Sequence, residues 1–443
     1  MRTQPLKIAM ISMHSSPIGR LGTPDTGGMS VYIRELARRM GGRGHRVDIF
    51  TRAANGGASD RIQPLSENVR LVALSAGGDG ALPKTALFTH VPAFFDVLDR
   101  FHTATHRDYD LIHSHYWLSG LVGQRARQAW GAPHITTFHT LGGMKLRVCG
   151  PGTEPTARIR AERKLVEVCD RVLLTSAREK TNLLRDAPAR PDHVEVVPCG
   201  VNLELFRPIA KPAARRRIGA AMEETLLLYV GRIAPEKGLD RLLRAFAQLQ
   251  HHSRLKVMIV GGEGGGDPGL QPVQALARWL GIAERIRFVG RMEQPELPYY
   301  YSAADMLVLP SSYESFGMVA LEAIACGTPV VATPVGAMEE LLHRHESGRL
   351  AVDVSAPSLA RAIDRMMRDQ ADRPATPERV RRSALRFSWH RVAADVLNVY
   401  REVLATHTPT PLARSEPEGE HGAHPIHVAC CGCGMFAAAE SGG

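Results

Sequence analysis

Short apolar runs alternate with longer stretches of helical periodicity along almost the whole chain. Most of these runs show no alternation of apolar and polar residues, which is typical of parallel strands covered by helices on both faces. Gly, Pro, Asp or Ser bounds them. The predicted strands are KIAMIS (7–12), RVDIFT (46–51), LVALSA (71–76), DLIHSH (110–115), HITTFH (134–139), RVLLTS (171–176), VEVVPC (194–199), LLLYVG (226–231), KVMIVGG (256–262), RIRFVG (285–290), MLVLPS (306–311) and PVVAT (329–333).

The alternation pauses once, over residues 202–225, where Pro208 and Pro212 occur and no strand pattern is present. This pause predicts two Rossmann-like, doubly wound α/β domains, over residues 1–204 and 205–386. A C-terminal helix is expected over 387–406, and its packing back on the first domain is left open. Residues 407–443 are rich in Pro, Gly and Glu and are expected to be disordered. Their CCGC cysteines are too crowded for a tetrahedral metal site, so a tail without metal is favoured.

Composition limits the function classes. The 443 residues are 44% hydrophobic and 23% charged, as in ordinary globular proteins, and the formal net charge is +10. Two explanations of this charge are equally good. One is a solvated basic surface, and the other is attraction to phosphorylated small molecules or to an anionic membrane face. The basic residues have no interleaved aromatics, which argues against nucleic acid. MRTQPLKIAMIS is no signal peptide and no run reaches the ~18 apolar residues of a membrane span, so a cytoplasmic location is expected.

Two segments that follow strands have the composition of anion-binding loops. In open α/β sheets, ligands bind beyond the carboxyl ends of the strands, where backbone amides and helix N-termini face anions. GTPDTGGMS (22–30) offers Gly27 and Gly28, which let a phosphate or sugar approach the backbone. GRIAPEKG (231–238) offers Arg232 and Lys237, a fork and a point charge suited to a pyrophosphate. A plain turn and a surface loop are the alternatives.

Other motifs give weaker signals. GGEGGG (261–266) lacks the full spacing of a dinucleotide fingerprint, and no acidic residue follows at the usual interval of ~20 residues. The two histidines of HSHYW (113–117) share a strand face, for which packing is favoured over a metal pair. His139 ends a strand and is the better candidate for contacting a ligand. Asp108-Tyr109-Asp110 resembles a metal-binding DxD motif but precedes its strand, at the opposite end of the sheet.

PSSYESFGMVALEAIACGTP (310–329) carries two glutamates, Glu314 and Glu322. Paired carboxylates suggest a general acid and base. Glu314, however, precedes the predicted helix and Glu322 lies near its second turn, so the helix N-terminus separates them. The amides of residues 316–318 leave that N-terminus toward any bound anion. The two glutamates are therefore expected at different levels of the site, on either side of the helix N-terminus.

Taken together, GGM (27–29), FHT (138–140), GRIAPEKG and E-x7-E resemble the retaining GT-B glycosyltransferases of the sucrose-synthase-like family, family 4, over roughly residues 6–405. GGMSVYIRELARRM and HSHYWLSGLVG are similar to the mycothiol-pathway members that add N-acetylglucosamine to inositol phosphate. LPKTALFTHVPAFFDVL is similar to the sucrose-phosphate synthases.

The resemblance implies a role for each donor-site residue. The donor would be UDP-glucose or UDP-N-acetylglucosamine, with Glu322 on the ribose, Glu314 on the transferred sugar and His139 near the reacting centre. Arg232 and Lys237 would neutralise the leaving pyrophosphate. The further donor contacts implied are the backbone at Gly27 and Gly28, the amides of Phe316, Gly317 and Met318, and the base-binding residues Arg291 and Met292.

The acceptor is less closely defined by the resemblance. The positions that match the family's acceptor residues are Tyr116, Thr140 and Arg158, with Lys84 a looser match. Ser30 stands where the inositol-phosphate enzymes carry an asparagine, and VCGPGTEPTARIR is a variant of this chain's own. These departures leave a phosphate-bearing or polyol acceptor, without a choice between them.

The resemblance implies retaining transfer of a hexosyl unit from a small-molecule donor to a small-molecule acceptor, in a cleft across which the two domains face each other; contact with a membrane is left open. Arg, Lys and a helix dipole would meet the charge of the leaving phosphate, so no obligatory metal or cofactor is expected. That phosphate would itself deprotonate the acceptor on the same face. A nucleotide-sugar 2-epimerase of the same architecture and a catalytically inactive sugar-nucleotide-binding protein are the alternatives.

Overall fold

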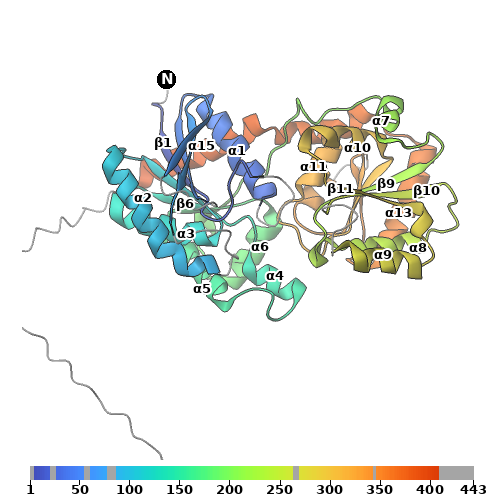
Figure 1. The fold of residues 1–443 in the computed structure, drawn as a ribbon, viewed down its shortest axis with the longest axis horizontal. Helices are drawn as coiled ribbons and strands as arrows, with labels where there is room; N and C mark the ends of the chain where they lie inside the picture. The colour runs from blue at the N-terminus through green and yellow to red at the C-terminus, as the bar shows by residue number, and fades with distance from the viewer. Residues whose placement is uncertain are drawn as a thin grey trace, which may run out of the picture. The chain divides into compact units, whose positions relative to one another are not determined.

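The computed structural model describes residues 4–19, 26–53, 60–76, 86–262, 269–342 and 346–408. Within these ranges the chain forms an eight-stranded sheet followed by a six-stranded sheet (Figure 1). We call each sheet with its helices the first half and the second half. Lys84, the CCGC cysteines and most of GGEGGG lie outside the described residues.

The first sheet has the order β3-β4-β2-β1-β5-β6-β7-β8. All of its neighbouring strands are parallel except β3 and β4, which pair antiparallel at one edge. Chain order reverses direction between β1 and β5, which creates a topological switch point there. The bounds are β1 Lys7–Ile11, β2 Arg46–Arg52, β3 Arg61–Ser66, β4 Val69–Leu74, β5 Leu111–His115, β6 His134–Thr137, β7 Arg171–Leu174 and β8 Val194–Val196.

The second sheet has the order β11-β10-β9-β12-β13-β14, and all its neighbouring strands are parallel. Its switch point lies between β9 and β12, so the segments that follow these two strands open toward the same crevice. The bounds are β9 Thr225–Val230, β10 Leu255–Val260, β11 Ile286–Gly290, β12 Met306–Leu309, β13 Val330–Ala332 and β14 Gly348–Leu350.

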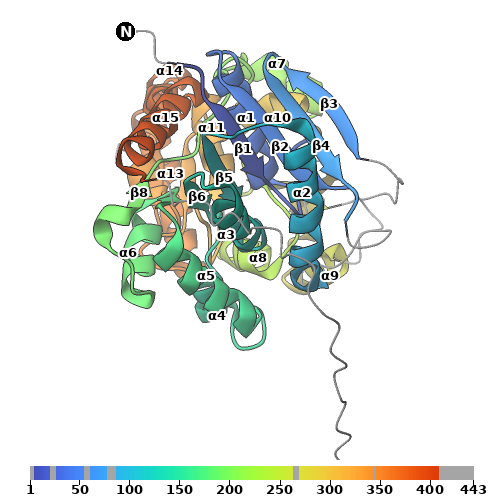
Figure 2. The ribbon, with the colours of Figure 1, turned by 90° about the vertical axis from the view of Figure 1, so that its left-hand side faces the viewer.

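Helices cover both faces of each sheet, and this explains why the strands read as continuous apolar runs. In β1, Ile8 and Met10 pack in one core cluster with helix α1. Ala9 and Ile11 of the same strand pack in a second cluster with helix α3. Figure 2 shows α2, α3 and α5 on the first half. Its helices are α1 Gly28–Gly41, α2 Val91–Thr105, α3 Trp117–Trp130, α4 Gly142–Cys149, α5 Thr156–Val168 and α6 Ala177–Asp186.

The second half repeats this layering, with alternate β9 residues buried in two different clusters. Its helices are α7 Lys211–Ile218, α8 Leu239–Ala247, α9 Leu270–Trp279, α10 Leu297–Ala303, α11 Met318–Ala325, α12 Met338–Leu341, α13 Ala356–Asp372 and α14 Pro377–Arg381. Among the described residues, no helix combines the length and the apolar character needed to cross a bilayer.

The last helix, α15 Trp389–Thr406, returns to the first half and lies beside α1 (Figure 1). The returning chain meets the outgoing one where the Val201 amide donates to the Phe387 carbonyl at 2.8 Å. On α15, the Tyr400 hydroxyl lies 2.6 Å from Nδ1 of His113 on β5. The indole of Trp389 lies 5.5 Å from the Tyr32 ring, measured between centroids. The C-terminal helix is therefore part of the core of the first half.

Three details differ from the sequence-based expectation. The antiparallel edge strand β3 and the three-residue β14 were not predicted. No helix was predicted within residues 202–225, yet they contain α7, which carries a proline in its first turn. Proline is compatible with that position because the first amides of a helix have no partner within it.

Candidate active site

A cavity of about 350 Å³ lies where strand ends of both halves face each other; we call it the strand-end cavity. From the first half it is lined by segments that follow β1, β5 and β6, together with the start of α1. From the second half it is lined by segments that follow β9 and β12. The sequence-predicted residues that line it are Gly27, Gly28, Tyr116, His139, Thr140, Arg232, Lys237, Glu314, Phe316, Gly317 and Met318.

An ion pair occupies the second-half wall of this cavity. The Lys237 ammonium lies 2.7 Å from Oε1 of Glu314, and these side chains are 22% and 11% exposed. The same carboxylate oxygen accepts a hydrogen bond of 2.8 Å from the Ser311 hydroxyl. Lys237 ends a 3-10 turn, Pro235–Lys237, that follows β9, whereas Glu314 follows β12. The switch point of the sheet therefore brings a cation and a carboxylate together.

Arg232 is the second cation of the cavity, and its guanidinium is partly free. It lies 3.3 Å from the carboxylate of Glu236 and remains 45% exposed. The backbone carbonyl of Arg232 accepts a hydrogen bond of 2.8 Å from the buried Tyr229 hydroxyl, which anchors the loop. An arginine held at its backbone and open at its tip can reach an oxyanion without moving the loop.

The N-terminus of α11 points a positive dipole at the cavity. Its N-cap residue, Gly317, has φ of 103°, a left-handed backbone conformation that residues other than glycine rarely adopt. A Cβ atom at this position would lie 2.4 Å from Cε of Met338. The first amides of a helix lack partners within the helix and serve as anion donors. Only glycine allows this helix to begin here.

Glu322 lies in different surroundings from Glu314. It is 7% exposed, lies outside the lining of the strand-end cavity and accepts a hydrogen bond of 2.8 Å from the Tyr301 hydroxyl. Burial raises the pKa of Glu322 to about 7, and hydrogen bonds from Tyr301 and Gln294 oppose part of that rise. Arg291 and Met292, which follow β11, also lie outside the cavity lining.

His139 has a backbone φ of 60°, which is uncommon for residues other than glycine. Its Nε2 lies 3.0 Å from Nδ1 of His115. Burial lowers the pKa of His139 to about 3, so the imidazole is neutral at physiological pH. The backbone carbonyl of His139 accepts a hydrogen bond from the Ser315 hydroxyl of the second half. The structure thus holds His139 from both halves.

The expected acceptor residues divide into two groups. Tyr116 and Thr140 line the strand-end cavity. Ser30 and Arg158 form the second group, because both are buried behind it. Ser30 is fully buried with its hydroxyl 2.7 Å from that of Ser15, and Arg158 is 1% exposed. The Arg158 guanidinium donates to Glu154, Glu162 and both oxygens of Thr140. Arg158 therefore orients Thr140 from behind the cavity.

Some residues that the sequence did not single out line the cavity, and others join the two halves. Lys145 of α4 lines the cavity and pairs with Glu154 at 2.7 Å. Tyr313 accepts a hydrogen bond of 3.0 Å from the Leu141 amide, and the Ser176 hydroxyl donates to the Ser315 carbonyl at 2.9 Å. Lys145 could have been found as a cation soon after FHT. Tyr313 and Ser315 carry no chemical signal of their own.

Family models match the chain in two successive blocks. Residues 27–200 match the "Glycosyl transferase 4-like domain" and residues 210–384 match "Glycosyl transferases group 1". A D-inositol 3-phosphate glycosyltransferase 2 of Catenulispora acidiphila is 41% identical over 411 residues, which cover 90% of this chain and 96% of that protein. The chain therefore belongs to the glycosyltransferase family that these two domain models and this relative represent.

Further relatives of this glycosyltransferase support the same family assignment. The D-inositol 3-phosphate glycosyltransferase of Streptomyces coelicolor is 39% identical over 432 residues, covering 91% of this chain and 93% of that protein. The structure of sucrose-phosphate synthase from Thermosynechococcus elongatus is 33% identical, with a TM-score of 0.82 over 90% of this chain and 99% of that one. The predicted GT-B fold and glycosyltransferase class are confirmed, and the epimerase alternative is not favoured.

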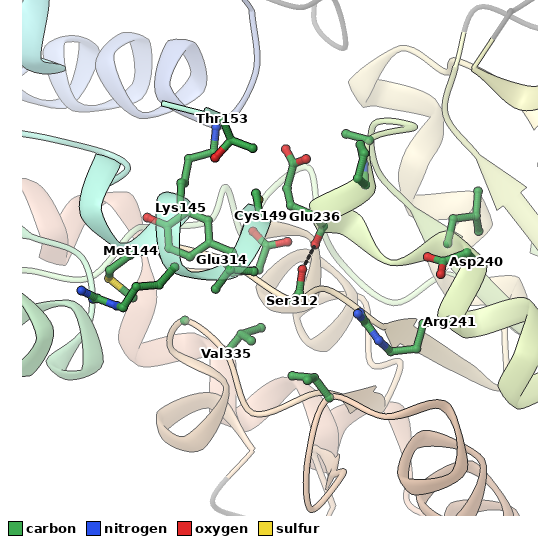
Figure 3. Close-up of a pocket in the computed structure, with 18 of the residues that line it drawn as sticks. Met144, Lys145, Cys149, Thr153, Glu236, Asp240, Arg241, Ser312, Glu314 and Val335 are labelled. Carbon is green, nitrogen blue, oxygen red and sulfur yellow. Dashed lines mark hydrogen bonds between the residues drawn. The ribbon is translucent and has the colours of Figure 1, made fainter. Parts of the chain in front are cut away.

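A wider groove of about 1310 Å³ continues from the strand-end cavity of this glycosyltransferase. The two share Lys145, Glu236, Tyr313 and Glu314. Figure 3 shows Lys145, Cys149 and Thr153 on one side of the groove and Glu236, Asp240 and Arg241 on the other. A hydrogen bond from the Ser312 hydroxyl to the Glu236 carbonyl fixes the loop between them. The groove thus reaches the strand-end cavity at Glu314.

Proposed function

We propose that this glycosyltransferase moves a hexosyl unit from UDP-glucose or UDP-N-acetylglucosamine to a hydroxyl group of a phosphorylated sugar or inositol, with retention at the anomeric carbon. The observation that carries this proposal is the charge arrangement at the second switch point. Lys237, Arg232 and the α11 N-terminus converge on one cavity wall. Such a set suits a pyrophosphate leaving group, whose charge grows as the glycosidic bond breaks.

The names of the relatives support the acceptor class. Two D-inositol 3-phosphate glycosyltransferases and a sucrose-phosphate synthase are at least 33% identical to this chain, which covers at least 93% of each. The Anabaena HepE structure, solved with UDP and glucose, is 18% identical with a TM-score of 0.69 and supports the fold alone. The UDP donor is proposed from the family resemblance and the second-half cations, and the phosphorylated acceptor from the relatives that are at least 33% identical.

In the proposed mechanism, Glu314 binds hydroxyls of the transferred sugar while its partner Lys237 moves to the departing phosphate. Glu322 binds the ribose, Arg291 and Met292 flank the base, and Gly27 and Gly28 admit the phosphates to the backbone. The neutral His139 contacts the sugar. The acceptor meets Tyr116 and Thr140, and its hydroxyl proton passes to the leaving phosphate on the same face, which gives retention without the two-carboxylate scheme of glycosidases.

The proposal is tested by UDP release from each UDP-sugar in the presence of inositol phosphate, a hexose phosphate and their unphosphorylated counterparts. Lys237→Ala should lower kcat by about two orders of magnitude, since it removes a donor to charge formed in the transition state. Glu322→Ala should mainly raise the donor KM. Lys164→Ala and Glu167→Ala, an exposed pair on α5, serve as controls. Absence of UDP release with every acceptor, or equal and negligible effects of both site variants, would refute the proposal.

A further inference from the structure

Gln294 lies between a residue of the first half and the buried glutamate of the second half. Nη2 of Arg34, on α1, donates to Oε1 of Gln294 at 3.2 Å. Gln294 begins the 3-10 turn Gln294–Glu296 that follows β11, and its side chain is hydrogen-bonded to the Glu322 carboxylate. A three-residue chain of hydrogen bonds thus connects α1 to α11.

The chemistry of its neighbours fixes the orientation of the Gln294 amide. A guanidinium can only donate hydrogen bonds, and an ionised carboxylate can only accept them. The amide oxygen of Gln294 must therefore face Arg34, and its NH2 group must face Glu322. Reversing the amide would set two donors against each other and two acceptors against each other, so the chain has one direction from Arg34 to Glu322.

We propose that Gln294 is a positioning residue that holds the Glu322 carboxylate for the nucleoside of the donor, and that Arg34 of the first half fixes Gln294 in that role. This inference rests on the proposed donor site, in which Glu322 accepts hydrogen bonds from ribose hydroxyls. It adds that the first half contributes to nucleoside binding through a side chain that does not itself touch the nucleotide.

Glu322 needs such a partner because it must be ionised to accept two hydroxyl groups, and its burial opposes ionisation. The groups that face it are the Tyr301 phenol from α10 and the Gln294 amide. Burial and the nearby Glu322 raise the pKa of the Cys326 thiol, and Arg381 of α14 opposes that rise. Tyr301 supplies one hydrogen bond and Gln294 the other. Loss of either donor would raise the pKa of Glu322 further above its present value of about 7.

The test is UDP affinity of the full chain by titration calorimetry between pH 5.5 and 8.5. Gln294→Leu should shift the pH at which affinity is lost upward by about one unit and weaken binding about tenfold near pH 6.5, as expected for one hydrogen bond to a charged group. At pH 8.5 the loss should shrink to about threefold or less. Arg34→Leu should shift the profile in the same direction by a smaller amount. Gln248→Leu, an exposed glutamine at the end of α8, is the matched control.

The outcomes separate this inference from the donor assignment. If wild type binds UDP but the profiles of Gln294→Leu and Arg34→Leu coincide with it, the inference is wrong and the proposed function stands. If wild type binds no uridine nucleotide at any pH, both fall. A loss of affinity that is equal at every pH would show a structural effect and also overturn the inference. Should Gln294→Leu fail to fold, Arg34→Leu alone decides, because it breaks the chain at its other end.

Discussion

Glu314 and Glu322 are eight positions apart, and their surroundings give them different tasks. Glu314 lines the strand-end cavity and pairs with Lys237, whereas Glu322 is buried against Tyr301. Because Glu322 lies outside the cavity that Glu314 lines, the two carboxylates do not face one reacting centre as an acid/base pair must. We expect Glu314 to exchange its lysine partner for substrate hydroxyls, and Glu322 to act where the nucleoside would bind.

The buried Glu322 makes stability depend on pH in a defined direction. Its folded-state pKa of about 7 lies above the ordinary value of 4.5. Between these values the folded protein holds a proton that the unfolded chain releases, so the free energy of unfolding falls as pH rises across this window. Glu322→Gln removes that loss. We expect the variant to match wild type near pH 4.5 and to exceed it by roughly 2–3 kcal/mol at pH 8 without ligand.

Urea unfolding at pH 4.5 and pH 8 measures this difference. Glu167→Gln, at an exposed position on α5, is the control and should change stability equally little at both pH values. A stability difference between Glu322→Gln and wild type that stays the same at pH 4.5 and pH 8 would contradict a raised pKa.

At the scale of elements, the packing of α15 gives a sharp prediction. A Cβ atom at Gly200 would lie 2.5 Å from the Trp389 ring, so Gly200→Ala forces α15 away from the first half. We expect a loss of about 1–3 kcal/mol of unfolding free energy, the usual cost of overpacking. In Gly143→Ala, the matched control on α4, the new Cβ would lie 3.9 Å from its nearest neighbour, the Asp186 carboxylate. It should be neutral or slightly stabilising. Equal unfolding midpoints for both variants would contradict this account.

The sequence predicts elements well where burial alone decides them. Each apolar run predicted as a strand overlaps an observed strand, because parallel strands covered on both faces must be apolar throughout. β3 was missed because RIQPLS lies at a sheet edge with mostly exposed residues and a proline. α7 was not predicted because Pro212 interrupts the helical pattern of this segment, although it lies in the first turn of the helix, where proline is tolerated.

The site was predictable to the extent that strand ends determine it. Arg232, Lys237, Glu314 and the α11 N-terminus follow strands and meet at the switch point. What the sequence does not show is whether a candidate cation is free for a ligand or already held by neighbouring side chains. Arg158 is a residue type that often binds phosphate, yet its guanidinium already donates hydrogen bonds to Glu154, Glu162 and Thr140. Such pairings depend on the final packing of α5 against its neighbours.

At the scale of the whole molecule, the two halves meet through hydrogen bonds around the cavity. Ser315 contacts both His139 and Ser176, and Arg178 lies 2.7 Å from Glu339. A ligand that binds both walls should favour this arrangement. We therefore expect UDP at 100 times its dissociation constant to raise the free energy of unfolding by about 2.7 kcal/mol. A thermal melt measures this as an increase in Tm, and uridine monophosphate, which lacks the pyrophosphate, should give a smaller one.

The same charges predict how the enzyme responds to metal removal. Lys237, Arg232 and the α11 dipole already supply positive charge to the proposed leaving group. We expect EDTA to leave both the UDP-induced increase in Tm and the rate of UDP release unchanged within about twofold. Mg²⁺ added back to the treated protein is the control. A large loss with EDTA that Mg²⁺ restores would mean that these residues are insufficient.

The return of α15 to the first half has a consequence for the order in which the protein is made. Tyr400 and Trp389 are partners of His113 and Tyr32, yet they leave the ribosome after the entire second half. The nascent first half must therefore wait with an uncovered face while the second sheet is being synthesised. The first half can complete its core only after the second half has been made, and an exchange of first halves between relatives would have to bring the eighteen residues of α15 along with it.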